Sequence, residues 1–282
     1  MSTDYIFRIE ELGQEFNPIV GKKCANLGEI AKIGLRVPPG FALSLDAYRQ
    51  FMSETGADKE ISEYLNGLTH GFETIDQFNE ASAELRRIVE SKEMPGEMKD
   101  RILSYNREIG LKCNAERVAV STRSAGASSH PGQYETHLNV IGEADLIRNI
   151  IKVWSSTFNA RSLSARKRLG LPLGSDPIGV AVIKMVNARS AGVLFTADPN
   201  TGNRSIMIIE ANWGLGESVV GGEAMPDVYV LDKESLEIVD TKLGSKKRCI
   251  TCQEIGVAEV ETSPDQCNAF CLSDQEVKEI GR

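Results

Sequence analysis

No stretch of about eighteen consecutive apolar residues occurs in this chain, so the sequence offers no segment long enough to span a membrane. Positive charge is also scarce, because 32 Lys and Arg face 40 Asp and Glu, for a net charge of −8. No basic stripe offsets this balance, which argues against a nucleic-acid partner. The N-terminus is acidic and lacks the apolar core of a signal peptide, so we expect a cytoplasmic protein.

The common nucleotide fingerprints are missing as well. Neither a Walker motif nor a dinucleotide-binding glycine pattern is present. The chain has 282 residues, of which 41% are hydrophobic and 26% charged, an ordinary composition for a globular protein. This length is enough for two lobes or for one large domain.

Cysteine is infrequent, and its six positions fall into two classes. Cys24 and Cys113 stand alone and are expected to be small buried side chains. The others form a C-x-x-C pair and a C-x-x-x-C pair: Cys249, Cys252, Cys267 and Cys271. Four thiolates can close a tetrahedral site, so a zinc-ribbon interaction module is one hypothesis for this segment. Disulfides are not expected in a cytosolic chain.

The most informative stretch runs from Val118 to Asn139. Its first three residues are apolar and mostly β-branched, which predicts a buried strand. Residues 121–132 are rich in Ser, Gly and Ala and contain a single basic residue, Arg123. Such a loop lets backbone N–H groups approach a ligand, and a lone guanidinium offers a planar fork of donors suited to phosphate. By residue type alone, an ordinary surface loop with an exposed arginine fits equally well.

A glycine turn and an amphipathic helix are predicted over residues 20–34. The apolar side of this helix is expected to be formed by Leu27, Ile30, Ala31 and Ile33. Lys22 and Lys23 stand at the helix start, where the helix dipole disfavours cations. Two lysines placed against that preference suggest an anion nearby.

Strands are predicted from residue 178 onward. The first ends in Lys184, Met185 and Val186, an apolar hinge that can hold a purine through backbone hydrogen bonds and a thioether face. The second strand ends near Thr196 and Asp198, at the kind of position where ligands of open sheets gather.

Two acidic residues belong to a glycine-rich corner that follows these strands. Glu210 and Glu217 could contact a ribose or coordinate a magnesium ion, and each could equally be a solvated residue at a strand end.

Three of these stretches together resemble the ATP-grasp domain of the pyruvate phosphate dikinase and phosphoenolpyruvate synthase family. Residues 122–139 follow the family pattern V-R-S-G-A-R-A-S-M-P-G-x-x-[DE]-T-x-L-N without a gap. Residues 21–29 are similar to G-G-K-x-A-N-L-G-E, and residues 191–227 are similar to A-G-V-x-F-T-x-D-P-x-T-G followed by W-G-L-G-E and P-D. The resemblance extends over about residues 10–280.

The resemblance implies an α+β, two-lobed ATP-grasp nucleotide-binding fold with mixed or antiparallel sheets and flanking helices. We expect an N-terminal lobe over residues 1–175 and a C-terminal lobe over 176–282. It implies ATP and Mg²⁺ as ligands, with Lys23 and Arg123 as catalytic phosphate-binding residues and Ser124 as a further ATP-binding residue. Two departures are notable: Lys22 replaces a glycine, and Ala127 replaces a second arginine, which removes one phosphate contact.

Several parts of the family are absent from the sequence. Residues 1–282 contain neither a D-x-E-W strand nor an L-Q-x-R-P motif, and they contain no phosphohistidine segment. We therefore expect a truncated chain whose partner subunit or domain carries the phosphorylatable histidine and the acceptor site. In this family, ATP gives a pyrophosphoryl group to the histidine, one phosphate leaves, and the remaining phosphoryl group is passed on.

The acceptor is suggested by the loop itself. The run S-H-P-G-Q-Y-E-T most resembles the ATP-binding subunit of phenylphosphate synthase, which favours phenol as acceptor, with pyruvate next. A non-catalytic regulatory or scaffolding subunit that retains the fold is the alternative hypothesis, motivated by Ala127 and by the missing C-terminal motifs.

Overall fold

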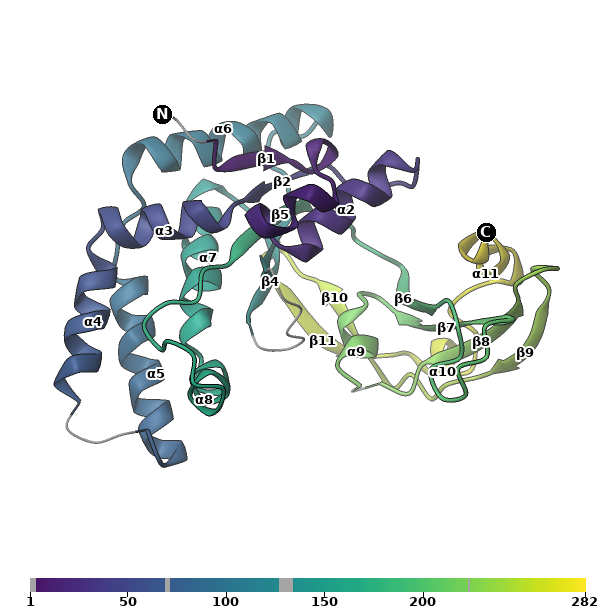
Figure 1. The fold of residues 1–282 in the computed structure, drawn as a ribbon. Helices are drawn as coiled ribbons and strands as arrows, with labels where there is room; N and C mark the ends of the chain where they lie inside the picture. The colour runs from purple at the N-terminus through teal and green to yellow at the C-terminus, as the bar shows by residue number, and fades with distance from the viewer. Residues whose placement is uncertain (1–3, 69–71, 127–133, 223) are drawn as a thin grey trace. The chain divides into compact units, whose positions relative to one another are not determined.

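The computed structural model describes residues 4–68, 72–126, 134–222 and 224–282 (Figure 1). The chain divides into two compact units, Met1–Met185 and Val186–Arg282. The predicted α+β ATP-grasp fold with antiparallel sheets and flanking helices is confirmed. The first unit extends beyond the expected boundary at residue 175, because the strand Gly179–Lys184 belongs to its sheet.

The first unit contains β1 (Ile6–Arg8), η1 (Ile9–Glu11), η2 (Gln14–Phe16), α1 (Asn17–Val20), α2 (Lys22–Lys32), β2 (Gly40–Leu43), α3 (Leu45–Glu54), α4 (Ala57–Gly67), α5 (Ile75–Glu90), α6 (Gly96–Lys112), β3 (Val120–Ala125), β4 (Thr136–Val140), α7 (Glu143–Ser155), η3 (Ser156–Phe158), α8 (Ala160–Arg168) and β5 (Gly179–Lys184). The second contains β6 (Ser190–Phe195), β7 (Ile206–Trp213), α9 (Glu217–Val220), β8 (Asp227–Asp232), β9 (Ile238–Lys242), β10 (Arg248–Cys252), β11 (Val257–Glu261), α10 (Pro264–Cys267) and α11 (Asp274–Gly281).

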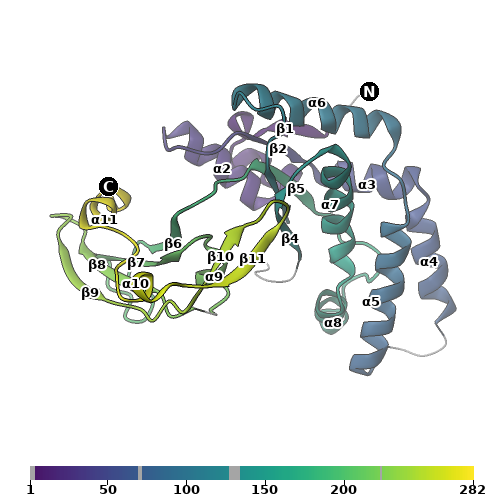
Figure 2. The same ribbon diagram turned by 180° about the vertical axis from the view of Figure 1, so that it is seen from behind.

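A five-stranded antiparallel sheet organises the first unit, in the order β1-β2-β5-β3-β4. Alternation along its strands separates two cores. Val120 and Val182 lie in the larger core, which α3 to α8 build around Trp154. Ala125 and Ala181 lie in a smaller cluster on the other face of the sheet, together with Val20 and Cys24 from the segment that leads into α2 and from α2 itself. Figure 2 shows the same sheet and helices from behind.

Local sequence signals mark the start of several of these helices. The Ser44 side chain accepts a hydrogen bond from the Ala47 N–H at the start of α3, and Thr74 with Gln77 forms a capping box at the start of α5. Satisfied N–H groups of this kind stabilise a helix by about 1 kcal/mol each. At the start of α2, by contrast, Gly21 supplies no side-chain cap.

The helix α2 differs from the prediction in the side that it buries. Cys24, Ala25 and Gly28 are buried, and the predicted Leu27 packs partly buried against the same cluster. Ile30 and Ile33 are exposed, so the prediction is wrong for these two residues. The reason is steric, because small side chains let this helix approach the backbone closely. A Cβ on Gly28 would lie 2.3 Å from the Leu12 carbonyl oxygen.

The second unit is built on the four-stranded antiparallel sheet β6-β7-β8-β9, with the hairpin β10-β11 beside it. Met207, Ile209 and Ala211 of β7 pack in a core with Tyr229 and with Val277 of α11. Residues of β7 that alternate with these, including Ile208 and Glu210, therefore face the other side of the sheet and are half-buried. No helix of the described ranges is both apolar enough and long enough to cross a membrane.

A fully buried ion pair connects three segments of the second unit. The Lys246 ammonium donates to an Asp227 carboxylate oxygen at 2.5 Å, and neither side chain is exposed to solvent. The same carboxylate accepts hydrogen bonds from the Gly244 N–H at 2.8 Å and the Cys271 N–H at 2.8 Å. A single carboxylate thus ties β8 to the segment before β10 and to the segment that leads into α11.

Replacing Lys246 by Met is expected to destabilise the second unit by about 3–5 kcal/mol, because it leaves a buried carboxylate without its counter-charge. Lys278→Met is the matched control: Lys278 pairs with Glu237 at 2.6 Å on the surface, so its loss should cost less than about 1 kcal/mol. Hydrogen exchange of peptides from β8 and β10 measures both changes. Equal protection in the two variants would show that the buried pair is dispensable.

Candidate functional site

Two cations that the sequence separates widely lie near each other in the first unit. Arg123 on β3 shares a sheet face with Ala125 and with Ala181, its register partner on β5. This is the face against which α2 packs, and Lys23 belongs to the first turn of α2. Both side chains are exposed, so they are accessible to a ligand.

The electrostatics of this pair favour an anion. Partial burial lowers the pKa of Lys23, and the positive charge of Arg123 lowers it further. In the part of the chain that the structure describes, no carboxylate contributes to this shift. The N-terminal end of α2 adds a positive partial charge from its helix dipole. The arrangement leaves positive charge uncompensated, as expected for a phosphate site.

The backbone that holds the two cations in place is closely packed. Gly21 has a φ of 85°, and a Cβ at this position would lie 2.3 Å from the Ala125 carbonyl oxygen. The Lys22 N–H donates to the Gly126 carbonyl at 3.0 Å. Only glycine accepts both this conformation and this proximity, so the glycine directly before the lysine pair docks α2 on the end of β3. The sequence reasoning did not assign this role to Gly21.

The side chain of Ser124 is placed differently from that of Arg123. Ser124 follows Arg123 on β3, so its side chain is on the opposite face of the sheet, and it is buried. Any contact that Ser124 makes with a ligand would therefore come from its backbone. Residues 127–133, which include Ala127, lie outside the described residues.

The hinge residues use part of their hydrogen-bonding capacity within the protein. The Lys184 N–H donates to the Pro39 carbonyl at 2.9 Å, and the Met185 N–H donates to the Ala119 carbonyl at 2.8 Å. These two donors are therefore occupied and are not offered to a purine. Val186 begins the second unit and is exposed.

Asp198 organises a turn. Its carboxylate accepts hydrogen bonds from the Asn200 N–H at 2.9 Å and from the Thr201 hydroxyl at 2.6 Å. These bonds hold the pKa of Asp198 below its usual value. The D-P-x-T-G run thus has a structural reason, because it closes the turn that follows β6. Thr196 is exposed just after that strand.

The two candidate glutamates of the second unit have different surroundings. Glu210 pairs with Val193 and Val228 on the sheet face opposite the core, so a carboxylate lies amid apolar neighbours. Glu217 is half-buried at the first position of α9. Burial raises the pKa of the Cys252 thiol, and the negative charge of Glu217 raises it further, so these two side chains are close.

The zinc-ribbon hypothesis is wrong. Cys249 and Cys252 lie three positions apart on the strand β10, so their side chains point to opposite faces of the hairpin. The Cys267 thiol donates weakly to backbone carbonyls, and Cys271 is buried in the core of the second unit. Over the four described ranges, no three His, Cys, Asp or Glu side chains gather in a way that would hold a metal ion.

Comparison with known proteins gives the same assignment as the motifs. Residues 17–282 match the family model described as pyruvate phosphate dikinase, AMP/ATP-binding domain. A probable phosphoenolpyruvate synthase of Staphylothermus marinus is 38% identical over 279 residues, which cover 96% of this chain and 33% of that protein. A probable phosphoenolpyruvate synthase of Methanocaldococcus jannaschii is 35% identical and covers 100% of this chain and 24% of its own length.

A third relative is the phosphoenolpyruvate synthase of Aeropyrum pernix, which is 35% identical over 89% of this chain and 31% of its own length. The chain thus spans about a third or less of the length of each of these three proteins. The match to the family model extends over most of the chain, including Lys23, Arg123 and all of the second unit. The chain belongs to the pyruvate phosphate dikinase AMP/ATP-binding domain family.

Proposed function

We propose that this chain binds ATP for a dikinase-type phosphotransferase, with Lys23 and Arg123 in contact with the phosphates. The observation that carries the proposal is the convergence of these two exposed cations, on a face where no described carboxylate neutralises Lys23. ATP brings several negative charges, which the pair and the N-terminal end of α2 would stabilise.

The same two residues would act in catalysis. Phosphoryl transfer needs little covalent help from a protein and depends on positioning and on stabilisation of charge in the transition state. A guanidinium can contact two phosphate oxygens at once, whereas the lysine ammonium acts as a compact point charge. In this proposal Arg123 orients the phosphate chain and Lys23 stabilises the charge that develops on it.

The remaining candidates stay predictions of contacts with the same nucleotide: Ser124, Lys184, Met185, Val186, Thr196, Asp198, Glu210 and Glu217. Among them, Glu210 is the residue whose surroundings most favour a ligand contact, because its half-buried carboxylate is flanked by the apolar side chains of Val193 and Val228. The Asp198 carboxylate has the least capacity left, since both of its oxygens already accept hydrogen bonds.

Magnesium is proposed to arrive bound to ATP. Protein sites for Mg²⁺ commonly supply one or two carboxylates, while substrate phosphates and water complete the octahedron. Glu210 or Glu217 could supply such a ligand.

For the final acceptor we now favour pyruvate. The three relatives described above carry the name phosphoenolpyruvate synthase, and they give no support to the resemblance to phenylphosphate synthase. In this proposal a histidine on a partner domain or subunit takes the group from ATP and passes one phosphoryl group to pyruvate. These relatives are much longer than the chain, which supports a multidomain arrangement.

We expect the chain to bind magnesium-ATP and Arg123→Ala to weaken this binding about 10- to 100-fold, as the loss of charge-assisted hydrogen bonds implies. Arg49→Ala is the matched control, because Arg49 is an exposed arginine of the same unit that pairs with Asp46 at 2.6 Å. Isothermal titration calorimetry measures both. Equal weakening in the two variants, or no binding by the unsubstituted chain, would contradict the proposed site and favour a scaffolding role.

Lys23→Gln should raise the melting temperature of the free protein while reducing the further rise that magnesium-ATP produces. The charge on Lys23 is unfavourable in the folded state, since its pKa is lowered there, so neutralising it removes a penalty. This penalty is fully present at neutral pH and fades as the pH rises through the lowered pKa. The gain in melting temperature should therefore shrink at alkaline pH.

The control for this experiment is Lys32→Gln at the other end of α2. Lys32 lies 3.6 Å from Glu15 and 3.7 Å from Glu29, where the helix dipole favours a cation. Its replacement should not raise the melting temperature and should leave the effect of ATP unchanged. Thermal unfolding with and without magnesium-ATP tests both variants, and a rise in both would mean that the gain is unrelated to the site.

A labelling experiment tests the transfer itself. When the chain is combined with its histidine-bearing partner domain, a radioactive label on the β-phosphate of ATP should remain on the protein. A label on the γ-phosphate should be released as phosphate, because the histidine keeps only the phosphoryl group next to it. Retention of the γ-label alone would indicate a simple kinase and not a dikinase.

A further inference from the structure

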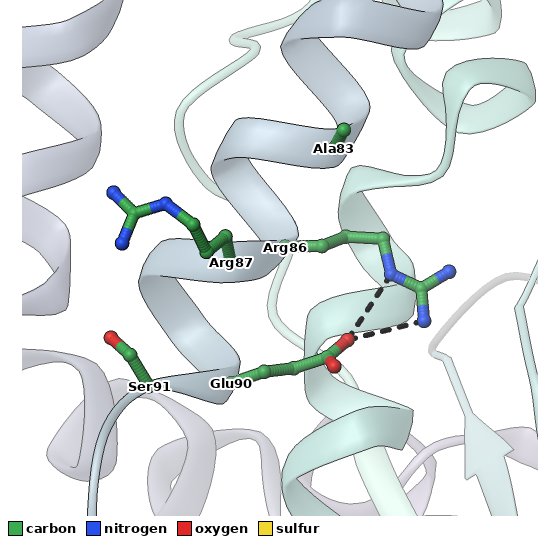
Figure 3. A pocket seen from close by; sticks show the side chains of 5 residues that line it. All are labelled: Ala83, Arg86, Arg87, Glu90 and Ser91. Atoms are coloured by element: carbon green, nitrogen blue, oxygen red, sulfur yellow. Dashed lines mark hydrogen bonds and ion pairs between the residues drawn. The ribbon is translucent and has the colours of Figure 1, made fainter.

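Arg86 on α5 is the centre of a polar network that no assigned role explains. Its guanidinium donates to the Glu135 carboxylate at 2.5 and 3.2 Å and to the Asn159 side-chain oxygen at 2.7 Å. It also pairs with Glu90 at 3.2 Å, one turn along the same helix. Figure 3 shows a pocket on α5 in which Arg86 and Glu90 meet, while Arg87, which also lines the pocket, extends to the side away from this pair.

The carboxylate that Arg86 holds lies at a sensitive place in the sheet. Glu135 directly precedes β4, and β4 is the edge strand that pairs only with β3. Two register pairs, Thr122 with His137 and Arg123 with Thr136, precede an irregularity in the pairing of these strands. This short end of β4 includes the register partner of Arg123, so whatever anchors Glu135 also anchors the strand beside Arg123.

Other contacts converge on the same point from the helices. The Glu135 N–H donates to the Ser156 hydroxyl at 3.1 Å, and Ser155 donates to Glu90 at 2.6 Å. Both partners of the Arg86–Glu135 pair are about 70% buried, with exposed side-chain fractions of 27% and 30%. Such a pair is screened less than a surface pair, and its planar two-point geometry restricts orientation as well as distance.

We propose that Arg86 is a positioning residue for the phosphate site, which holds the start of β4 beside Arg123 through its pair with Glu135. This inference rests on the proposed function, because Arg123 matters only if it binds a phosphate. Arg86 itself need not touch the nucleotide. Its loss would let the edge of the sheet next to Arg123 shift, and the geometry of phosphate binding would deteriorate.

The test is a comparison of ATP with adenosine, which carries no phosphate. Arg86→Gln and Glu135→Gln should each weaken magnesium-ATP binding about tenfold, a factor within the range of coupling energies between neighbouring residues. Both variants should leave adenosine binding unchanged, because adenosine has no phosphate for Arg123 to contact. Arg87→Gln is the control on the same helix, because Arg87 pairs only with Glu84 among its described partners and is largely exposed. Arg87→Gln should bind both ligands like the unsubstituted chain.

Two further measurements separate positioning from general stability. Arg86→Lys keeps the charge but loses the two-point geometry, so it should recover only part of the ATP affinity. In an Arg123→Ala background, Arg86→Gln should have little additional effect on ATP, because the residue that it positions is gone. An effect of the same size with and without Arg123, or an equal loss of ATP and adenosine binding, would overturn the inference.

The outcomes also distinguish this inference from the proposed function. No binding of magnesium-ATP by the unsubstituted chain would overturn both. ATP binding that depends on Arg123 but is unaffected by Arg86→Gln and by Glu135→Gln would overturn the positioning role alone. If Arg86→Gln fails to fold, Glu135→Gln and Arg86→Lys still decide the question, because they keep the size or the charge of the side chains they replace.

Discussion

Repulsion between like charges is the constraint on which the candidate site depends. Lys23 and Arg123 lie near each other although the charge of Arg123 disfavours that of Lys23. A fold does not gather cations without a carboxylate unless other interactions hold them. Here those interactions are backbone contacts and a small buried cluster beneath α2. The free energy of folding thus supports an arrangement of like charges that the proposed phosphate ligand would stabilise.

In each of the two units, glycines allow two backbone segments to approach each other closely. Gly21 lets α2 lie against the end of β3, and Gly28 lets the same helix lie against Leu12. In the second unit a Cβ on Gly192 would lie 1.9 Å from the Glu210 carbonyl oxygen, so β6 and β7 pair tightly at the candidate glutamate. Two of these three glycines, Gly21 and Gly192, thus bring backbone segments together next to proposed ligand contacts.

Much of this arrangement could be predicted from the sequence, and the failures have physical causes. A strand that includes Val120 and a helix after Gly21 follow from hydrophobic pattern and turn chemistry. The predicted loop over residues 121–132 is wrong at its start, because β3 continues to Ala125 and Arg123 lies on this strand. On α2 the prediction held for Leu27 but failed for Ile30 and Ile33, which are exposed because small residues make the closest contact. The zinc hypothesis failed because the C-x-x-C spacing does not reveal that both cysteines lie on one strand, where residues three positions apart face opposite sides. The Arg86–Glu135 pair spans 49 positions, and no local pattern reveals such a contact.

The buried ion pair of the second unit has a consequence for chemical reactivity. Lys246 has no exposed surface, and its ammonium is held by Asp227 and by the Gly244 carbonyl. Reagents that acylate amines need a solvent-accessible, deprotonated nitrogen, so this lysine should remain unmodified for as long as its surroundings stay closed. The rate at which Lys246 is modified would then report how often the second unit opens locally.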